Sequence, residues 1–172
     1  VVMHDTSGDD SFAVHIGSRV RKMHTSRRDA FKSINTVPAA NIDKDWKITL
    51  NMDLPSKRDG KVIVKEGMCS KTVLLQYYPG MDSALFEDVF MKSEGVVIAG
   101  SGLGHVNENM IPLIEKAVKN GTIVVMTSQC INGQTNMNVY NTGRDLISAG
   151  VISVFDMLPE TAYVKLSWAL AN

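Results

Sequence analysis

The densest group of ionisable side chains lies between residues 18 and 32, which include the stretch RVRKMHTSRRDAFK. These residues hold six basic side chains against a single acid, Asp29. The plainest interpretation is a solvated loop leading into a helix. A dense set of Arg and Lys could instead contact phosphates, although the interleaved aromatic residues of single-strand binders are lacking. Alternatively, Lys22 sits among cations such as Arg21 and Arg27 and would give up its proton more readily, and a neutral lysine can act as a base.

A second candidate is the glycine-dense segment AGSGLGHVNEN, which leaves an apolar run and enters a helical pattern. At the carboxyl ends of parallel strands, backbone N–H groups and the helix dipole favour carboxylates or phosphates. Gly100, Gly102 and Gly104 form G-x-G-x-G, but His105 stands where a dinucleotide fingerprint needs its third glycine. Two interpretations remain open: a ligand cradle that includes His105, or a tight turn that simply needs glycine.

A third candidate is the polar loop TSQCINGQTNMN, which follows another apolar run. Its amides and hydroxyls suit either a substrate wall or a subunit contact. Cys130 in this loop is interpreted as a buried, inert thiol in preference to a nucleophile. His4, His15 and His24 show no metal-ligand spacing, so no metal site is expected. With only two isolated cysteines, a reducing, cytoplasmic compartment is expected.

The elements that would position these segments follow a regular pattern from about residue 70. The apolar runs TVLLQYY, GVVIAG, TIVVMTS and VISVFD alternate with segments of helical period. Asn107 is expected to cap the second helix, Gly150 to stop the third, and Pro159 to begin the last. Apolar strands joined by helices predict an α/β domain with a doubly wound parallel sheet, covered on both faces.

Residues 1–68 do not repeat this pattern. Strands are expected at VVMH and SFAVHI, followed by a hairpin of KITLNMDL against KVIVKEG that turns near Asp59 and Gly60. We therefore expect the tail of an N-terminal α/β domain plus a crossover hairpin over 1–68, and a C-terminal domain, incomplete at its end, over 69–172. The abrupt start on a strand and the end within a helix are interpreted as cuts.

Bulk composition excludes several classes of protein. Of the 172 residues, 44% are hydrophobic, which is typical of a globular chain and not of a disordered one. Eighteen basic residues balance eighteen acidic ones, so no global field steers nucleic acid to the surface. No apolar run approaches the roughly 18 residues that a membrane span needs, so no membrane contact is expected.

Six blocks, in the same order, resemble the asparaginase family, and within it the D subunits of archaeal glutamyl-tRNA(Gln) amidotransferases. The blocks are VRKMHTSRRDAFKSIN, YYPGMD, GSGLGHV, MTSQC, NVYNTGRDLISAGVI and DMLPETAYVKLSWAL. The resemblance implies an asparaginase-like fold of two α/β domains, with active sites between the subunits of a homodimer or larger oligomer. It also implies a threonine nucleophile in a T-G-G-T block and a second threonine in a G-T-D-T block, and neither block occurs in these 172 residues.

Aligned on the FKS at residues 31–33, the family's catalytic lysine falls on Lys22. The resemblance implies that glutamine is hydrolysed and that its ammonia passes to the E subunits of these amidotransferases. Those subunits would use ATP and Mg to amidate Glu-tRNA(Gln), and no cofactor is expected in this chain. Gly102, His105 and Tyr140 are carried over as substrate-binding or intersubunit residues. Exported bacterial asparaginases have Asn and Glu where this chain has His105 and Tyr140, which argues against an exported asparaginase.

Two alternatives remain. A cytoplasmic type I L-asparaginase shares the fold and the lysine, and would act on asparagine. A non-enzymatic module that docks RNA through its basic segment is a different class of function, and neutral net charge disfavours it. On the leading interpretation, these 172 residues alone should be inactive because they lack the nucleophile.

Overall fold

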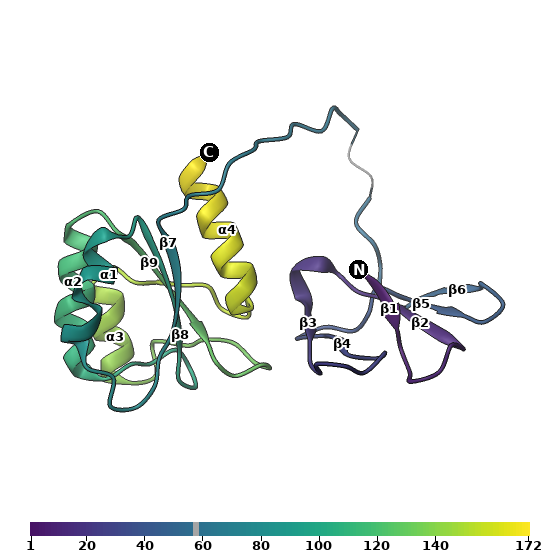
Figure 1. Cartoon of the computed structure of the whole chain (residues 1–172), viewed down its shortest axis with the longest axis horizontal. Coiled ribbons are helices and arrows are strands. Elements are labelled where there is room, and N and C mark those ends of the chain that lie inside the picture. Colours follow the sequence, from purple (N-terminus) through teal and green to yellow (C-terminus); the bar gives the residue numbers. More distant parts are fainter. Residues whose placement is uncertain (57–58) are drawn as a thin grey trace. The chain divides into compact units, whose positions relative to one another are not determined.

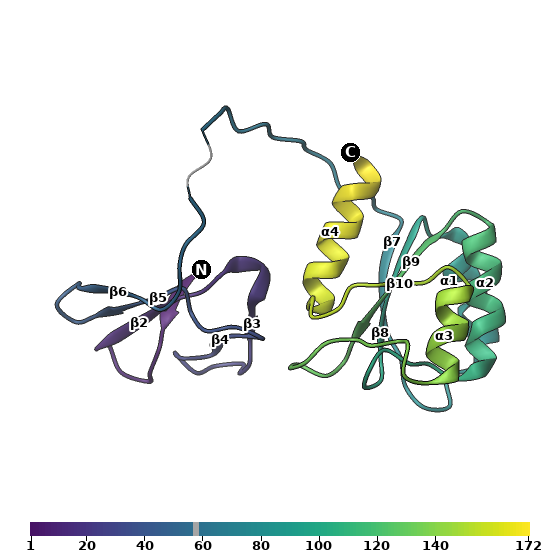
Figure 2. The same ribbon diagram turned by 180° about the vertical axis from the view of Figure 1, so that it is seen from behind.

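The computed structural model describes residues 1–56 and 59–172 and divides the chain into two compact units. The first unit is Val1–Ile63 and the second is Val64–Asn172. Figures 1 and 2 show the two units from opposite sides.

The second unit is built on a parallel four-stranded sheet with the order β10-β9-β8-β7. One face carries the three shorter α-helices of this unit and the other carries its longest helix, α4, as Figures 1 and 2 both show. The doubly wound parallel sheet predicted from the sequence is therefore confirmed. The strands are β7 (Thr72–Gln76), β8 (Gly95–Gly100), β9 (Ile123–Ser128) and β10 (Ile152–Ser153). The helices are η2 (Ser83–Phe86), α1 (Glu87–Lys92), η3 (Glu108–Met110), α2 (Ile111–Lys119), α3 (Asn141–Ser148) and α4 (Pro159–Ala171).

Burial explains why these segments take these forms. Every residue of β8 is buried, which accounts for its continuous apolar sequence. The helix α2 buries Leu113, Ile114 and Ala117 along one stripe. Asn107 does precede η3, but its side chain does not cap the helix. The Asn107 Oδ1 atom instead accepts a hydrogen bond from the Tyr77 hydroxyl.

The first unit consists of two antiparallel sheets. The larger has the order β1-β2-β5-β6 and the smaller is the pair β3-β4. The strands predicted at VVMH and SFAVHI are confirmed as β1 and β2. The elements are β1 (Val2–His4), β2 (Ser11–Val14), η1 (Gly17–Arg19), β3 (Val20–Lys22), β4 (Phe31–Ser33), β5 (Ala40–Asp43) and β6 (Ile48–Leu50).

The predicted crossover hairpin is wrong. The strand β6 pairs with β5, which precedes it, and residues 61–69 contain no strand. The Asp43 carboxylate accepts hydrogen bonds from the backbone N–H groups of Asp45 and Lys47, at 3.0 and 2.9 Å, which closes a turn directly after β5. The predicted helix start in the basic segment is also wrong, because that segment forms the β3–β4 hairpin.

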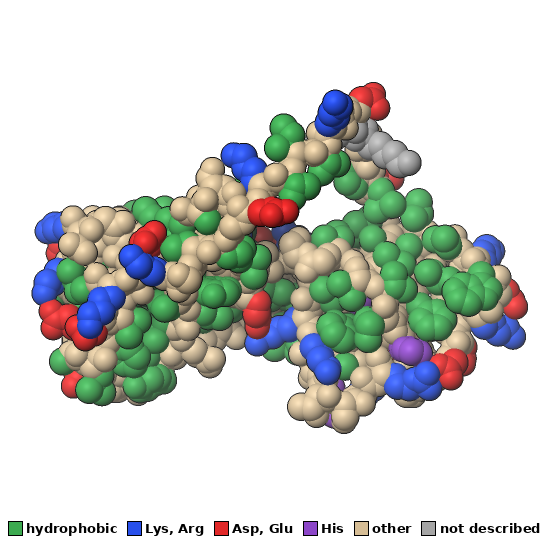
Figure 3. All heavy atoms as spheres, turned by 45° about the horizontal axis from the view of Figure 1, so that its top comes forward, with side chains coloured by type: hydrophobic (Ala, Val, Ile, Leu, Met, Phe, Trp, Pro, Cys, Tyr) green, Lys and Arg blue, Asp and Glu red, His purple; other side chains and the backbone are tan. Residues whose placement is uncertain are grey.

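Hydrophobic side chains gather on the surface of the first unit, as Figure 3 shows. Trp46, Ile48 and Leu50 are among the exposed ones, at 76%, 63% and 59% exposure. Large exposed apolar patches are uncommon on isolated domains and mark contact surfaces. Across residues 1–56 and 59–172, no helix has the length and apolar character needed to cross a membrane.

Candidate active site

Lys22 is the last residue of β3 and lies opposite Phe31 of β4. Its side chain is exposed at a shallow pocket of about 380 Å³, which is lined by Lys22, Met23, His24 and Thr25. Within the described part of the chain, the Lys22 ammonium forms no ion pair. A lysine in this position has its amino group available to a ligand or to a neighbouring polar group.

Several cations of the same segment are held by carboxylates. Arg27 binds Asp29 through two N–H···O contacts, at 2.9 and 2.8 Å, and Lys32 lies 3.4 Å from the same carboxylate. The Arg27 hydrogen bonds are the main reason that the pKa of Asp29 lies below its usual value. Arg28 is paired with Asp9. These pairs leave the basic segment less cationic than its sequence suggests.

The loop that follows Lys22 is closed by backbone contacts. The Met23 N–H donates to the Ala30 carbonyl at 2.6 Å. Inside the loop, His24 Nδ1 accepts hydrogen bonds from the backbone N–H groups of Ser26 and Arg27, at 3.1 and 3.2 Å. The β3–β4 loop is therefore a defined turn.

In the second unit, the glycine-dense segment forms a tight turn at the carboxyl end of β8. Ser101 and His105 exchange two backbone hydrogen bonds of 2.9 and 3.0 Å. Gly102 and Gly104 adopt φ values of 48° and 98°, a region that favours glycine. The Gly102 carbonyl accepts a hydrogen bond from Ser128 Oγ at 2.5 Å, which joins this turn to the end of β9.

His105 and Tyr140 are brought together although 35 positions separate them in the sequence. Their rings meet edge to face, with centroids 5.3 Å apart. The Thr142 hydroxyl lies 3.4 Å from His105 Nδ1, whereas the buried His105 Nε2 has no partner in the described structure. Burial lowers the pKa of His105, so the ring is held neutral at pH 7. A neutral imidazole can donate or accept a hydrogen bond without adding charge.

We expect the stability of the second unit to fall as the pH drops below about 6.5, the pKa of histidine in an unfolded chain. Below that pH the unfolded chain binds a proton that folded His105 resists, so stability is complete above it and declines toward the folded pKa. The slope should not exceed about 1.4 kcal/mol per pH unit for one histidine. Urea unfolding between pH 5 and pH 8 measures this slope. The signal is the fluorescence of Trp168 in a Trp46→Phe background.

The control for this pH dependence is His105→Asn, which removes the titrating group. The variant should flatten the slope between pH 5 and pH 7 even if it is less stable at every pH. An unchanged slope in His105→Asn would assign the effect to another group.

Gly143 allows the helix α3 to approach this cluster. A Cβ atom at Gly143 would lie 2.1 Å from the Met137 carbonyl oxygen and 2.9 Å from His105 Cε1. Gly143→Ala is therefore expected to destabilise the second unit by about 1–3 kcal/mol, because backbone atoms cannot yield as a flexible side chain can. Gly17→Ala is the matched control, since nothing lies within 4 Å of its added Cβ. Equal stability of both variants in urea unfolding would contradict the close approach.

Gln129 was not predicted as a structural contact. Its backbone N–H donates to the Gly100 carbonyl at 2.9 Å, and its side chain donates to the carbonyls of Tyr77 and Ala99. It thereby ties together the carboxyl ends of β7, β8 and β9. The buried position expected for Cys130 is wrong, because Cys130 is exposed. From the sequence, both residues were only members of a polar loop.

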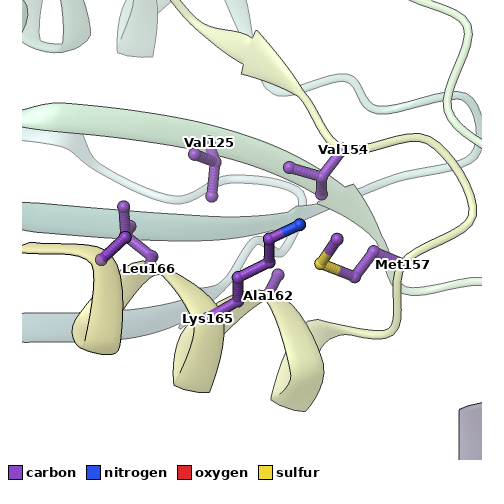
Figure 4. Close-up of a pocket in the computed structure, with 7 residues that line it drawn as sticks. Val125, Val154, Met157, Ala162, Lys165 and Leu166 are labelled. Carbon is purple, nitrogen blue, oxygen red and sulfur yellow. The ribbon is translucent and has the colours of Figure 1, made fainter. Parts of the chain in front are cut away.

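A second pocket, of about 170 Å³, lies between α4 and the sheet. Figure 4 shows the Lys165 side chain extending from α4 across it. Lys165 is the one ionisable residue in a lining that is otherwise apolar: Val125, Val154, Met157, Ala162, Lys165, Leu166 and Ala169. This lining offers no acid–base pair, so the pocket is a poorer candidate for catalysis than the β3–β4 turn or the turn after β8.

The structure thus groups the predicted site residues in two places. Gly102, His105 and Tyr140 lie at the carboxyl end of the parallel sheet, and Lys22 lies in the first unit. In residues 1–56 and 59–172, no group of three or more His, Cys, Asp or Glu side chains could hold a metal ion.

Comparison with known protein families gives two matches that together cover most of the chain. Residues 71–172 match the glutaminase/asparaginase C-terminal domain, and residues 1–55 match the N-terminal asparaginase domain. Two L-asparaginase structures are similar. The enzyme from Thermococcus kodakarensis has a TM-score of 0.86 and 28% identity, over 93% of this chain and 49% of that one. L-asparaginase I from Vibrio cholerae has a TM-score of 0.80 and 28% identity, over 95% of this chain and 49% of that one.

Curated relatives are more similar in sequence, and they include the D subunits of several glutamyl-tRNA(Gln) amidotransferases. The one from Thermococcus kodakarensis is 51% identical over 100% of this chain. The one from Pyrobaculum aerophilum is 50% identical over the same share. The chain spans 40% and 42% of the length of these two relatives.

Proposed function

Because the chain belongs to the glutaminase/asparaginase family, we propose that it carries the catalytic lysine of a glutamine-hydrolysing amidotransferase subunit. The observation that supports this most is the identity of 51% to one of the amidotransferase D subunits along the whole chain, against 28% to the L-asparaginases. The proposed role is to release ammonia from glutamine for the conversion of Glu-tRNA(Gln) to Gln-tRNA(Gln).

In the proposed mechanism, a threonine hydroxyl attacks the amide carbon of glutamine and forms an acyl-enzyme, with release of ammonia. The Lys22 amino group accepts the hydroxyl proton and passes it on to the leaving nitrogen. Water then hydrolyses the ester to glutamate and restores the threonine. Backbone N–H groups stabilise the oxyanion that forms in each step. Within the described residues Lys22 forms no ion pair, so its amino group is available to a nucleophile or a substrate.

The partners follow from the same proposal. Ammonia would pass to a protein like the E subunits of these amidotransferases, which would amidate Glu-tRNA(Gln) with ATP and Mg. Assembly would be a homodimer through the asparaginase domains, in the cytoplasm. Gly102, His105 and Tyr140 are proposed as substrate-binding or intersubunit residues, since they lie at the carboxyl end of a parallel sheet, where ligands of such sheets collect.

The isolated 172-residue chain is expected to show no glutaminase activity. The threonine blocks that would supply the nucleophile are absent from its sequence, and Lys22 has no acyl acceptor to activate. Ammonia release from glutamine by the purified chain, compared with the complete protein, measures this. Turnover by the isolated chain would show that the nucleophile lies among these residues.

The alternative enzyme is a cytoplasmic type I L-asparaginase, which the similarity to L-asparaginase I supports. The two functions are separated by the ratio of kcat/KM for glutamine and asparagine in the complete protein. Preference for glutamine supports the amidotransferase, and preference for asparagine supports the asparaginase. The RNA-docking alternative is disfavoured, because Arg27 and Arg28 are paired with Asp29 and Asp9 and are not free to contact phosphates.

A further inference from the structure

Side-chain contacts inside the turn after Lys22 hold its backbone in place. The turn begins where β3 ends, at Lys22, and returns to β4 at Phe31. In an ordinary hairpin, a long loop of this kind would leave the last strand residue free to fray. Here the contacts inside the loop limit that freedom, and Lys22 lies directly next to them.

His24 supplies the first contact. Its Nδ1 atom accepts the backbone N–H groups of both Ser26 and Arg27. Accepting two hydrogen bonds requires an unprotonated Nδ1, so the ring proton lies on Nε2. The imidazole therefore fixes the backbone two and three residues after itself, in the manner of an Asx turn.

Asp29 supplies the second contact at the other end of the loop. The Asp29 side chain is 9% exposed, and its carboxylate accepts hydrogen bonds from both Nε and Nη2 of Arg27. The adjacent Lys32 of β4 lies 3.4 Å from Asp29 Oδ2 and 3.4 Å from the Asp5 carbonyl. Arg27 thus links the two contacts, because its N–H binds His24 and its side chain binds Asp29. Both contacts of the β3–β4 loop therefore involve Arg27.

We propose that His24 and Asp29 are positioning residues that hold the β3–β4 turn so that the Lys22 amino group stays in its catalytic place. This inference rests on the proposed role of Lys22. A displacement of about 1 Å at a reacting group can cost about 100-fold in rate, so residues that fix the position of Lys22 are expected to have a large effect on kcat.

The experiment compares His24→Ala with His24→Asn in the complete protein. Asparagine keeps a side-chain acceptor that can reach the same N–H groups, whereas alanine removes it. His24→Ala should lower kcat for glutamine about 10- to 100-fold with little change in KM, and His24→Asn should restore most of that loss. Hydrogen exchange at the Ser26 and Arg27 amides should accelerate in His24→Ala and remain slow in His24→Asn.

Asp29→Asn tests the other end of the loop, with Asp45→Asn as the control for the same change of charge. Asp45 is an exposed residue of the β5–β6 turn. Asp29→Asn should lower kcat with KM little changed, and Asp45→Asn should leave both unchanged.

The outcomes separate the two ideas. Normal kcat in His24→Ala, together with loss of activity in Lys22→Met, would overturn the positioning role and leave the proposed function intact. Normal activity in Lys22→Met would overturn the proposed function itself. Equal loss in His24→Ala and His24→Asn would also contradict the role given to Nδ1.

Discussion

Replacing Lys22 by methionine in the complete protein is expected to lower kcat for glutamine hydrolysis by about 100- to 10,000-fold, the usual contribution of a general acid–base group. Methionine has a similar length and no proton to transfer, so neither attack by the nucleophile nor departure of ammonia is assisted. Because the substitution removes a proton relay and leaves the binding surface in place, KM should change far less than kcat. Steady-state glutaminase kinetics measure both constants.

The fold should tolerate this change. Lys22 is exposed and pairs with Phe31 through its backbone, which the substitution leaves in place. The stability of Lys22→Met should therefore lie within about 0.5 kcal/mol of the parent protein. Lys44→Met, in the exposed β5–β6 turn, is the matched control and should keep full activity. Near-normal turnover in Lys22→Met, with the fold intact, would rule out the catalytic role.

The second large effect is expected from Phe90→Ala, in the core of the second unit. Phe90 has 0% exposure and belongs to the main hydrophobic cluster, with Val96, Ile98 and Met126 of the sheet. Removing the ring leaves a cavity between α1 and the sheet, and such truncations typically cost about 3–5 kcal/mol. The free energy of unfolding of a whole domain is only about 5–15 kcal/mol, so Phe90→Ala would remove a large part of it.

Urea unfolding followed by Trp168 fluorescence, in the Trp46→Phe background, measures the loss in Phe90→Ala. Leu85→Ala is the matched control from the same side of the sheet, because Leu85 is 74% exposed and should lose no more than about 0.5 kcal/mol. A small effect of Phe90→Ala, similar to that of Leu85→Ala, would show that the ring is not buried as described. Met126 of this core also lies against Gly100 and Gly104, so the glycine turn after β8 packs on the same cluster.

The parallel sheet was predictable because its signals are local. The strands of this sheet lie in short apolar runs, and the helix α2 shows its buried stripe at helical spacing. The assignment of Lys22 came from the family resemblance, because its own neighbourhood showed only a run of positive charge. The positions of the glycines in the β8 turn likewise indicated a site without indicating which side chains would meet there.

The sequence by itself determined the α/β class, the doubly wound parallel sheet and the family to which the chain is similar. It did so because hydrophobic period and motif order are properties of neighbouring residues. Only the tertiary structure decided that β6 pairs with β5, that Arg27 and Arg28 are neutralised by Asp29 and Asp9, and that His105 meets Tyr140. These contacts depend on which distant segments come together when the chain folds, and periodicity carries no information about that choice.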